Sequence, residues 1–247
     1  MSILKSLPVT KPPALPEFFN MGLGGIAGAG KTHLVGTPGK GKRLLNIDLE
    51  GGTTTYSSGT FKGSPDATDN IDVISFNDVP DATSLIGRIE GILDYLIINK
   101  NKEKYDLVVI DSLTELQEKF LSLHKAPDKR QSYGAFRDSL YTIVHKARLA
   151  PVHTIFTARL KATQDDVLNR EVVRFEVSPG AWGVISGLFD IIAMLDVKRV
   201  GMGNNAKLVR VLDAEHGLRF TGKDRIGVHG MTDPTMAKIL AKSGGTN

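Results

Sequence analysis

The chain has 247 residues, of which 41% are hydrophobic and 23% are charged, and it carries a formal net charge of +4. That length suits one α/β domain with modest additions, and the composition excludes a chain that is disordered throughout. The lack of cysteine excludes disulfides, thiolate metal sites and cysteine nucleophiles, and the six histidines show no metal-ligand spacing.

A membrane-bound protein is not expected either. No apolar run approaches the roughly 20 residues that a bilayer requires, and the first residues lack the apolar core of a signal peptide. We therefore expect a cytoplasmic protein without a membrane partner. The small positive net charge permits an acidic partner such as nucleic acid, but an excess of four charges indicates it only weakly.

A phosphate-binding loop is the first motif along the chain. Residues 1–16 contain four prolines and predict an extended tail, whereas residues 18–23 predict a strand. Gly25 to Thr32 then fit G-x-x-x-x-G-K-[ST], a pattern whose glycines let backbone N–H groups converge on a phosphate. Lys31 is expected to reach the β- and γ-phosphates and Thr32 to coordinate Mg²⁺, at the start of a helix. The residues expected to bind the nucleotide are Gly25, Ala27, Gly28, Ala29, Gly30, Lys31, Thr32 and His33.

A second strand leads into acidic residues. Residues 43–48 predict a short apolar strand, with Asp48 and Glu50 at its end. Alternation along an extended chain places both carboxylates on one side, at the edge where open α/β sheets bind ligands. The elements expected next are a loop at 51–70, a strand at 71–76 and an amphipathic helix at 82–98.

A third strand supplies another carboxylate. Residues 105–112 contain a continuous apolar run, which predicts a strand buried on both faces, and the run ends in Asp111. An apolar strand that ends in aspartate is common, but after a phosphate loop it predicts the carboxylate beside Mg²⁺. Ser112 is expected to cap the helix that follows.

Later elements carry basic residues. A helix is expected at about 132–149, then a strand from Val152 to Thr157 that ends in Ala158 and Arg159. At a strand's carboxyl edge Arg159 suits a sensor of the γ-phosphate, and a solvated arginine is the alternative. The other elements expected are a hairpin at 165–177 turning near Asn169, strands at 189–197 and 207–212, and a short helix at about 234–241.

Three of these segments together resemble the RecA-like branch of P-loop ATPases: Gly25 to Thr32, Ile47 to Glu50, and Val108 to Ser112. More closely, the chain resembles phage-encoded nucleotide-binding proteins of that branch, a group that includes RecA-like single-strand annealing ATPases. The closer resemblance covers residues 18–226. It rests on the short motifs Tyr133-Gly134, Ile155 to Arg159, and Lys223-Asp224-Arg225.

The resemblance implies an α/β fold in which helices flank a mainly parallel central sheet, with an antiparallel C-terminal extension. The expected organisation is an extended N-terminal tail at 1–16, a RecA-like ATPase domain at 17–230, and a short C-terminal helix and tail at 231–247.

The resemblance also implies an Mg²⁺-dependent ATP hydrolase with ATP and Mg²⁺ as its cofactors. Its catalytic residues would be Lys31, Glu50, Asp111 and Arg159, with Glu50 at the position of the glutamate that polarises the attacking water and Thr32 and Asp111 at the metal. Members of the branch assemble as rings or filaments with a basic finger from the next subunit. Lys223 and Arg225 are the candidates for that finger.

Members of the family bind single-stranded DNA through loops after the later core strands. The matching region is 161–183, where Lys161, Arg170, Arg174 and Trp182 supply the basic and aromatic groups that such binding uses. A structural hairpin with the tryptophan packed in the core is the alternative. The implied role is phage DNA recombination or strand annealing in the host-cell cytoplasm, with phage single-strand-binding or recombination proteins as further partners.

Two other functions fit the phosphate loop. One is a kinase acting on a small molecule or nucleoside, although the chain shows no arginine-rich lid. The other is a non-hydrolysing module whose bound nucleotide controls assembly. No base-reading motif distinguishes ATP from GTP.

Overall fold

The computed structural model describes residues 17–100, 105–165, 169–201, 206–217 and 219–243. The tail expected at 1–16 lies outside these ranges, as do residues 202–205 between the strands expected at 189–197 and 207–212. The strands are β1 (Asn20–Gly25), β2 (Arg43–Asp48), β3 (Asn70–Ser75), β4 (Leu107–Asp111), β5 (His153–Asp165), β6 (Arg170–Phe175), β7 (Ile191–Val200), β8 (Lys207–Asp213), β9 (Lys223–Asp224) and β10 (Met231–Thr232). The helices are α1 (Lys31–Val35), α2 (Gly59–Lys62), α3 (Ala82–Ile98), α4 (Leu113–Leu123), α5 (Lys129–Leu149), α6 (Pro179–Ile185) and α7 (Met236–Ser243), with 3-10 helices η2 (Gly52–Ser57) and η3 (Ser186–Leu188).

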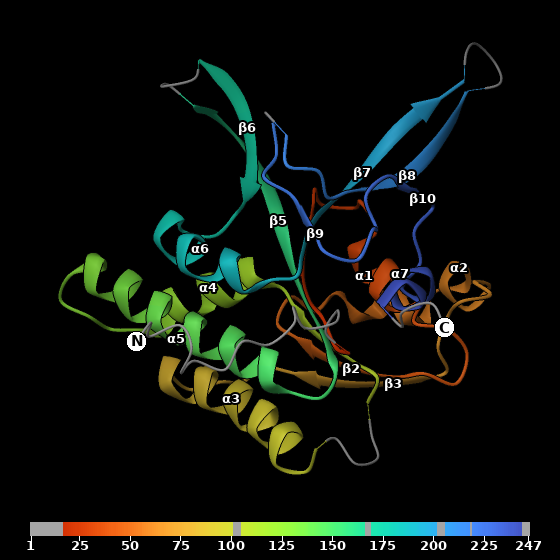
Figure 1. The fold of residues 1–247 in the computed structure, drawn as a ribbon. Helices are drawn as coiled ribbons and strands as arrows, with labels where there is room; N and C mark the ends of the chain where they lie inside the picture. The colour runs from red at the N-terminus through yellow and green to blue at the C-terminus, as the bar shows by residue number, and fades with distance from the viewer. Residues whose placement is uncertain (1–16, 101–104, 166–168, 202–205, 218, 244–247) are drawn as a thin grey trace, which may run out of the picture.

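A mostly parallel sheet forms the centre of the fold (Figure 1). Its strand order is β10-β8-β7-β1-β5-β4-β2-β3, and β6 and β9 pair with β5 and β7 outside this path. The strands from β7 to β3 in this order run parallel, whereas β6, β8, β9 and β10 pair antiparallel with their neighbours. The expected α/β architecture with an antiparallel extension is therefore confirmed.

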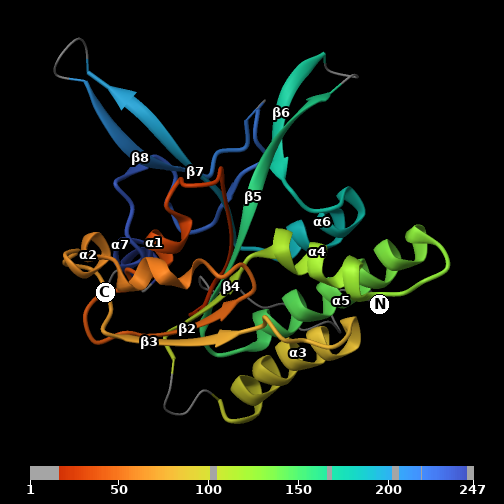
Figure 2. The same ribbon diagram turned by 180° about the vertical axis from the view of Figure 1, so that it is seen from behind.

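Helices cover both faces of the sheet because alternate side chains of the central strands enter two different cores. In β4, Val108 and Ile110 pack into the core beneath α3, α4, α5 and α6, whereas Leu107 and Val109 pack into the core beneath α1 and α7. All four side chains are fully buried, as a parallel strand covered on both faces requires. Figures 1 and 2 show the two groups of helices on opposite sides of the sheet.

Two hairpins project from the end of the sheet at which the parallel strands have their carboxyl ends. β5 continues beyond the sheet as an antiparallel hairpin with β6, and β7 continues as a hairpin with β8 (Figures 1 and 2). Both β5 and β7 are neighbours of β1. The strand expected to end at Arg159 is thus wrong in its length, because β5 runs on to Asp165 through its pairing with β6.

The segment expected as a loop at 51–70 is also wrong in part. It contains η2 and α2, and the rings of Tyr56 and Phe61 from these helices pack together with centroids 5.3 Å apart. Ser58 caps α2, since its side chain accepts a hydrogen bond from the backbone N–H of Phe61. None of the helices in the described part of the chain is long and apolar enough to cross a membrane.

Candidate functional site

The phosphate loop connects β1 to α1 at the carboxyl ends of the parallel strands. Gly28 has a φ of 76° and Gly30 a φ of 97°, values that L side chains rarely adopt. The backbone N–H of Ala29 closes a turn on the carbonyl of Ile26 at 3.2 Å. The strand, loop and helix expected around these glycines are all present.

Lys31 starts α1 and folds back over the loop. Its Nζ donates hydrogen bonds to the carbonyl oxygens of Gly25, at 2.8 Å, and Ile26, at 3.2 Å. Burial lowers the pKa of Lys31, and the nearby carboxylates of Glu50 and Asp111 oppose that change. The ammonium therefore lies within the electrostatic reach of both acidic residues expected at the site.

Thr32 and Asp111 meet where α1 passes the end of β4. The Thr32 hydroxyl donates to Oδ2 of Asp111 at 3.0 Å, and the carboxylate is 1% exposed. Burial raises the pKa of Asp111, while hydrogen bonds from the Thr157 and Thr32 hydroxyls act to lower it. Adjacent hydroxyl and carboxylate oxygens are the hard ligands that Mg²⁺ prefers, so the two residues fit the metal expected there.

Asp48 and Glu50 do not lie on one side of an extended chain as expected. β2 ends at Asp48, whose buried carboxylate accepts hydrogen bonds from the N–H of Glu50 at 3.1 Å, the N–H of Gly51 at 2.7 Å and the Thr53 hydroxyl at 2.8 Å. The chain turns around this carboxylate, which leaves Glu50 exposed. Asp48 therefore shapes the turn, and Glu50 is the carboxylate of the pair that is open to solvent.

Arg159 lies within β5 and is not a free group at a strand end. Its guanidinium pairs with Glu118 through Nη2 and with Glu176 through Nε at 2.9 Å. The hydrogen bond from Nε to Glu176 is the main cause that raises the pKa of Arg159. A γ-phosphate would have to compete with two carboxylates for this arginine.

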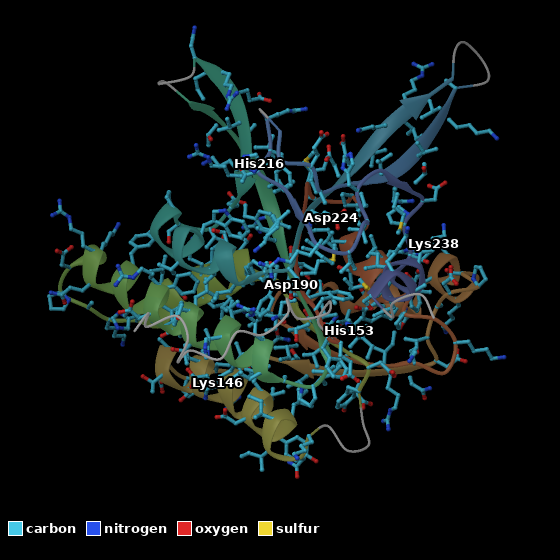
Figure 3. The ribbon with its side chains drawn as sticks, in the orientation of Figure 1. Lys146, His153, Asp190, His216, Asp224 and Lys238 are labelled. Atoms are coloured by element: carbon cyan, nitrogen blue, oxygen red, sulfur yellow. The ribbon has the colours of Figure 1, made fainter. Side chains whose placement is uncertain are left out.

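The two basic residues expected to reach a neighbouring subunit are engaged within the chain. Lys223 donates from Nζ to the carbonyl of Gly187 at 3.1 Å, and Arg225 pairs through Nη1 with Asp190 at 2.7 Å. Asp190 is buried and also accepts the backbone N–H of Asn20. Figure 3 labels Asp190 in the interior of the fold. The pairing of Arg225 therefore serves the fold of its own chain.

Three of the four residues expected on the DNA-binding hairpin line one cavity. Lys161 of β5 lies opposite Arg174 of β6, and both border a cavity of about 610 Å³ that is also lined by Trp182. Trp182 stacks on Phe175 with centroids 4.3 Å apart and an interplanar angle of 12°. Arg170 is placed at the far end of β6 and is not one of the lining residues.

Sequence reasoning did not identify three contacts of the site. The Thr157 hydroxyl donates to Oδ1 of Asp111, and the Tyr56 hydroxyl accepts from Nδ2 of Asn46 at 2.7 Å. Burial raises the pKa of Tyr56. Arg210 of β8 donates from Nε to the carbonyl of Ala29 at 3.1 Å. Thr157 is a polar residue that directly follows the apolar residues Ile155 and Phe156, and this pattern could have indicated it. No local pattern points to Arg210.

Comparisons with known proteins place the chain in a family. No curated protein sequence matches it. One similar solved structure is described as a prototypical ATPase from the type III secretion system of pathogenic bacteria, with a TM-score of 0.46, 15% identity and 72% of this chain covered. This chain spans about half of that ATPase, 51% of its length. Residues 18–226 match the family described as AAA domain, and because this match covers more than half of the chain, the chain belongs to that family.

Proposed function

We propose that this AAA domain protein hydrolyses ATP with Mg²⁺, binds single-stranded DNA and assists phage DNA recombination or strand annealing in the host-cell cytoplasm. The observation that carries the hydrolysis is the convergence of Lys31, Thr32, Asp111 and Glu50, which come from α1, β4 and the turn after β2. Phosphoryl transfer depends on positioned charges of this kind more than on covalent chemistry.

The phosphates would enter the glycine loop, where backbone N–H groups surround them. The ammonium of Lys31 donates hydrogen bonds to the carbonyls of Gly25 and Ile26. On nucleotide binding it would give up these hydrogen bonds and donate to oxygens of the β- and γ-phosphates instead. Thr32 and Asp111 would hold Mg²⁺, which neutralises charge that develops on the phosphates. Burial of Asp111 keeps competing water away from this carboxylate.

Glu50 is the residue that would handle the water. Its carboxylate is exposed, and the turn closed by Asp48 fixes its backbone. Glu50 would orient a water molecule and accept its proton as the water oxygen bonds to the γ-phosphorus and the bond to the bridging oxygen breaks. ADP and inorganic phosphate are the products.

Support for single-stranded DNA comes from the β5–β6 hairpin. Lys161 and Arg174 border the cavity at its base, and beside them lies Trp182, which is partly buried against the core and stacks on the buried Phe175. A backbone-tracking cation beside an aromatic platform is how proteins hold single strands without reading their sequence. The hairpin also projects from the sheet, where a polymer can reach it (Figure 1).

The decisive measurement is ATP hydrolysis with Mg²⁺, with and without single-stranded DNA. We expect turnover that single strands stimulate, that Lys31→Ala abolishes, and that Glu50→Gln lowers by about 100-fold while ATP still binds. Glu90→Gln is a matched control, because Glu90 lies on α3 and pairs with Lys146 of α5, and neither helix carries a proposed residue of the nucleotide site. Undiminished turnover in Glu50→Gln would remove this residue from the mechanism, and turnover indifferent to DNA would leave an ATPase with another partner.

A second candidate is a nucleotide-gated assembly module that does not hydrolyse. The ion pairs of Arg159 favour it, because they occupy the cation expected at the γ-phosphate. The module would form a ring or filament with ATP and recruit phage recombination proteins. Sedimentation with ATP, with ADP and without nucleotide would separate the candidates, since only the module assembles with ATP and returns it uncleaved.

A further inference from the structure

Arg210 reaches the phosphate loop from outside the loop. It belongs to the antiparallel strand β8, yet its Nε donates to the carbonyl of Ala29 at 3.1 Å. A Cβ placed on Gly30 would lie 3.0 Å from the same Nε. The guanidinium is therefore in contact with the Ala29–Gly30 peptide unit.

The backbone of Arg210 is held on both sides. It pairs with Val197 of β7, its carbonyl accepts the N–H of Asp233 at 2.7 Å, and its N–H donates to Oδ1 of Asp233 at 3.3 Å. In the described part of the chain no carboxylate pairs with the guanidinium, so its positive charge is not neutralised by an ion pair there. The fold thus fixes the residue and leaves its charge facing the loop.

The contact acts on a group that binds phosphate. The carbonyl of Ala29 and the N–H of Gly30 belong to one peptide unit, so a charged donor on the carbonyl polarises the N–H and strengthens it as a donor. Backbone N–H groups of such loops are the ones that hold the phosphates. The guanidinium charge also attracts the phosphates directly.

We propose that Arg210 is a positioning residue for nucleoside di- and triphosphates, which fixes and polarises the Ala29–Gly30 peptide unit and so tightens phosphate binding. This inference rests on the proposed nucleotide-binding function. It adds to that function a contribution from the C-terminal extension: the β7–β8 hairpin is part of the nucleotide site of its own chain, and a displacement of β8 would change how tightly the loop holds its ligand.

The test compares dissociation constants of ATP and ADP, measured by calorimetry on the full chain. Arg210→Gln should bind both nucleotides about tenfold more weakly, since it loses a charge-assisted hydrogen bond. Arg210→Lys should recover part of the loss. Arg199→Gln removes the same charge from the same hairpin, at a residue without a contact to the loop, and should bind like the wild type.

Two further readouts separate positioning from a structural role. When the rate of hydrolysis is measured over a range of ATP concentrations, Arg210→Gln should raise KM. At saturating ATP, kcat should stay within about twofold of the wild-type value, because the residue acts on binding. In the nucleotide-free protein the amide resonance of Gly30 should shift in Arg210→Gln and stay unshifted in Arg199→Gln.

Unchanged nucleotide affinity and an unchanged Gly30 resonance in Arg210→Gln would overturn the inference while the proposed function stands. If the wild type binds neither nucleotide, the proposed function fails instead. Should Arg210→Gln unfold more readily than the wild type, Arg210→Met decides, because methionine keeps an unbranched apolar side chain and removes the charge. Wild-type nucleotide affinity and a wild-type Gly30 resonance in Arg210→Met would contradict the inference.

Discussion

Thr157 holds the orientation of the Asp111 carboxylate, which would bind the metal. It is fully buried on β5, and its hydroxyl donates to Oδ1 of Asp111 while Thr32 holds Oδ2. Partners of this kind orient a ligand without touching the metal, and their loss costs about 10- to 100-fold in metal affinity or activity.

We therefore expect Thr157→Val, which keeps the shape of the side chain, to raise the Mg²⁺ concentration that gives half-maximal ATP hydrolysis by about tenfold. Thr154→Val is the matched control, because Thr154 is equally buried on the same strand and its hydroxyl donates to the carbonyl of Val152. Equal magnesium requirements in the two variants would show that the hydroxyl of Thr157 does not position Asp111.

His153 makes stability depend on pH. Burial lowers its pKa to about 4, and the charge of Lys42 acts in the same direction. Its Nδ1 accepts the backbone N–H of Phe19, which requires an unprotonated nitrogen. Since the unfolded chain takes up a proton near pH 6.5 and the folded chain only near pH 4, the stability is complete above pH 6.5 and is lost as the pH falls towards 4.

The loss should be on the order of 3 kcal/mol by pH 4, because each tenfold difference in proton affinity between the unfolded and the folded chain contributes about 1.4 kcal/mol. Urea unfolding of the wild type and of His153→Gln between pH 7.5 and pH 4 measures it, because glutamine keeps an acceptor and does not titrate. Parallel pH dependences in the two proteins would contradict the prediction.

At the scale of elements, the ion pair between Asp190 and Arg225 joins the loop before β7 to the segment after β9. Asp190 also accepts the N–H of Asn20 at the start of β1, so a buried carboxylate links three parts of the sheet. Removing one partner leaves the other charge without compensation, which is costly for a buried group. Because the guanidinium of Arg225 is half-exposed, we expect the loss of stability to lie at the lower end of what breaking a buried ion pair costs.

We expect Arg225→Gln to lower the free energy of unfolding by about 2 kcal/mol, measured by urea titration. Lys223→Gln is the control, since this lysine donates to the backbone carbonyl of Gly187 and should change stability little. If Arg225 acted instead as a finger towards a neighbouring subunit, Arg225→Gln would keep its stability and lose turnover only in the assembled protein.

Strands and helices with one strong local signal were predictable from the sequence. β4 is such a case, because its apolar run and terminal Asp111 fix a buried strand, and Ser112 caps α4 as expected. The length of β5 was not predictable, because residues 160–165 form a strand only through their pairing with β6. The helices η2 and α2 arise from packing of Tyr56 and Phe61, which the Gly- and Ser-rich composition of that segment conceals.

The residues of the candidate site were likewise predictable where a local motif carries them and unpredictable where distant parts of the chain meet. Lys31 and Thr32 follow from one continuous motif, and Asp111 follows from the strand that carries it. The contact of Arg210 with Ala29 joins residues 181 positions apart, so only the folded sheet reveals it. Arg159 was expected at the end of its strand but lies within β5, and its two glutamate partners, which come from α4 and from the chain after β6, were not expected.

At the scale of the whole molecule, a net charge of +4 gives no strong attraction to DNA, so binding must depend on the local hairpin surface. If Lys161, Arg170 and Arg174 each neutralise one phosphate of a single strand, the logarithm of the affinity should fall with the logarithm of the salt concentration with a slope of about −2.

Lys161→Gln should reduce that slope by about 0.7. Lys238→Gln is the control, because Lys238 lies on α7, away from the β5–β6 hairpin (Figure 3). Fluorescence anisotropy of a labelled oligonucleotide between 50 and 300 mM salt, roughly the range in which such slopes are measured, gives both values. Identical slopes in all three proteins would exclude Lys161 from the DNA contact.

The two hairpins leave the sheet on either side of the end of β1. The last residues of β1 pair with Arg159 of β5 and Met194 of β7, and each of these strands continues for about six residues, or roughly 20 Å, beyond that point. A tilt of about 10° at the base would move each tip by about 3.5 Å over that length. The phosphate loop therefore begins where β5 and β7 leave the sheet, so a shift of the loop around a ligand would be carried along both strands and would change the distance between the ends of the two hairpins.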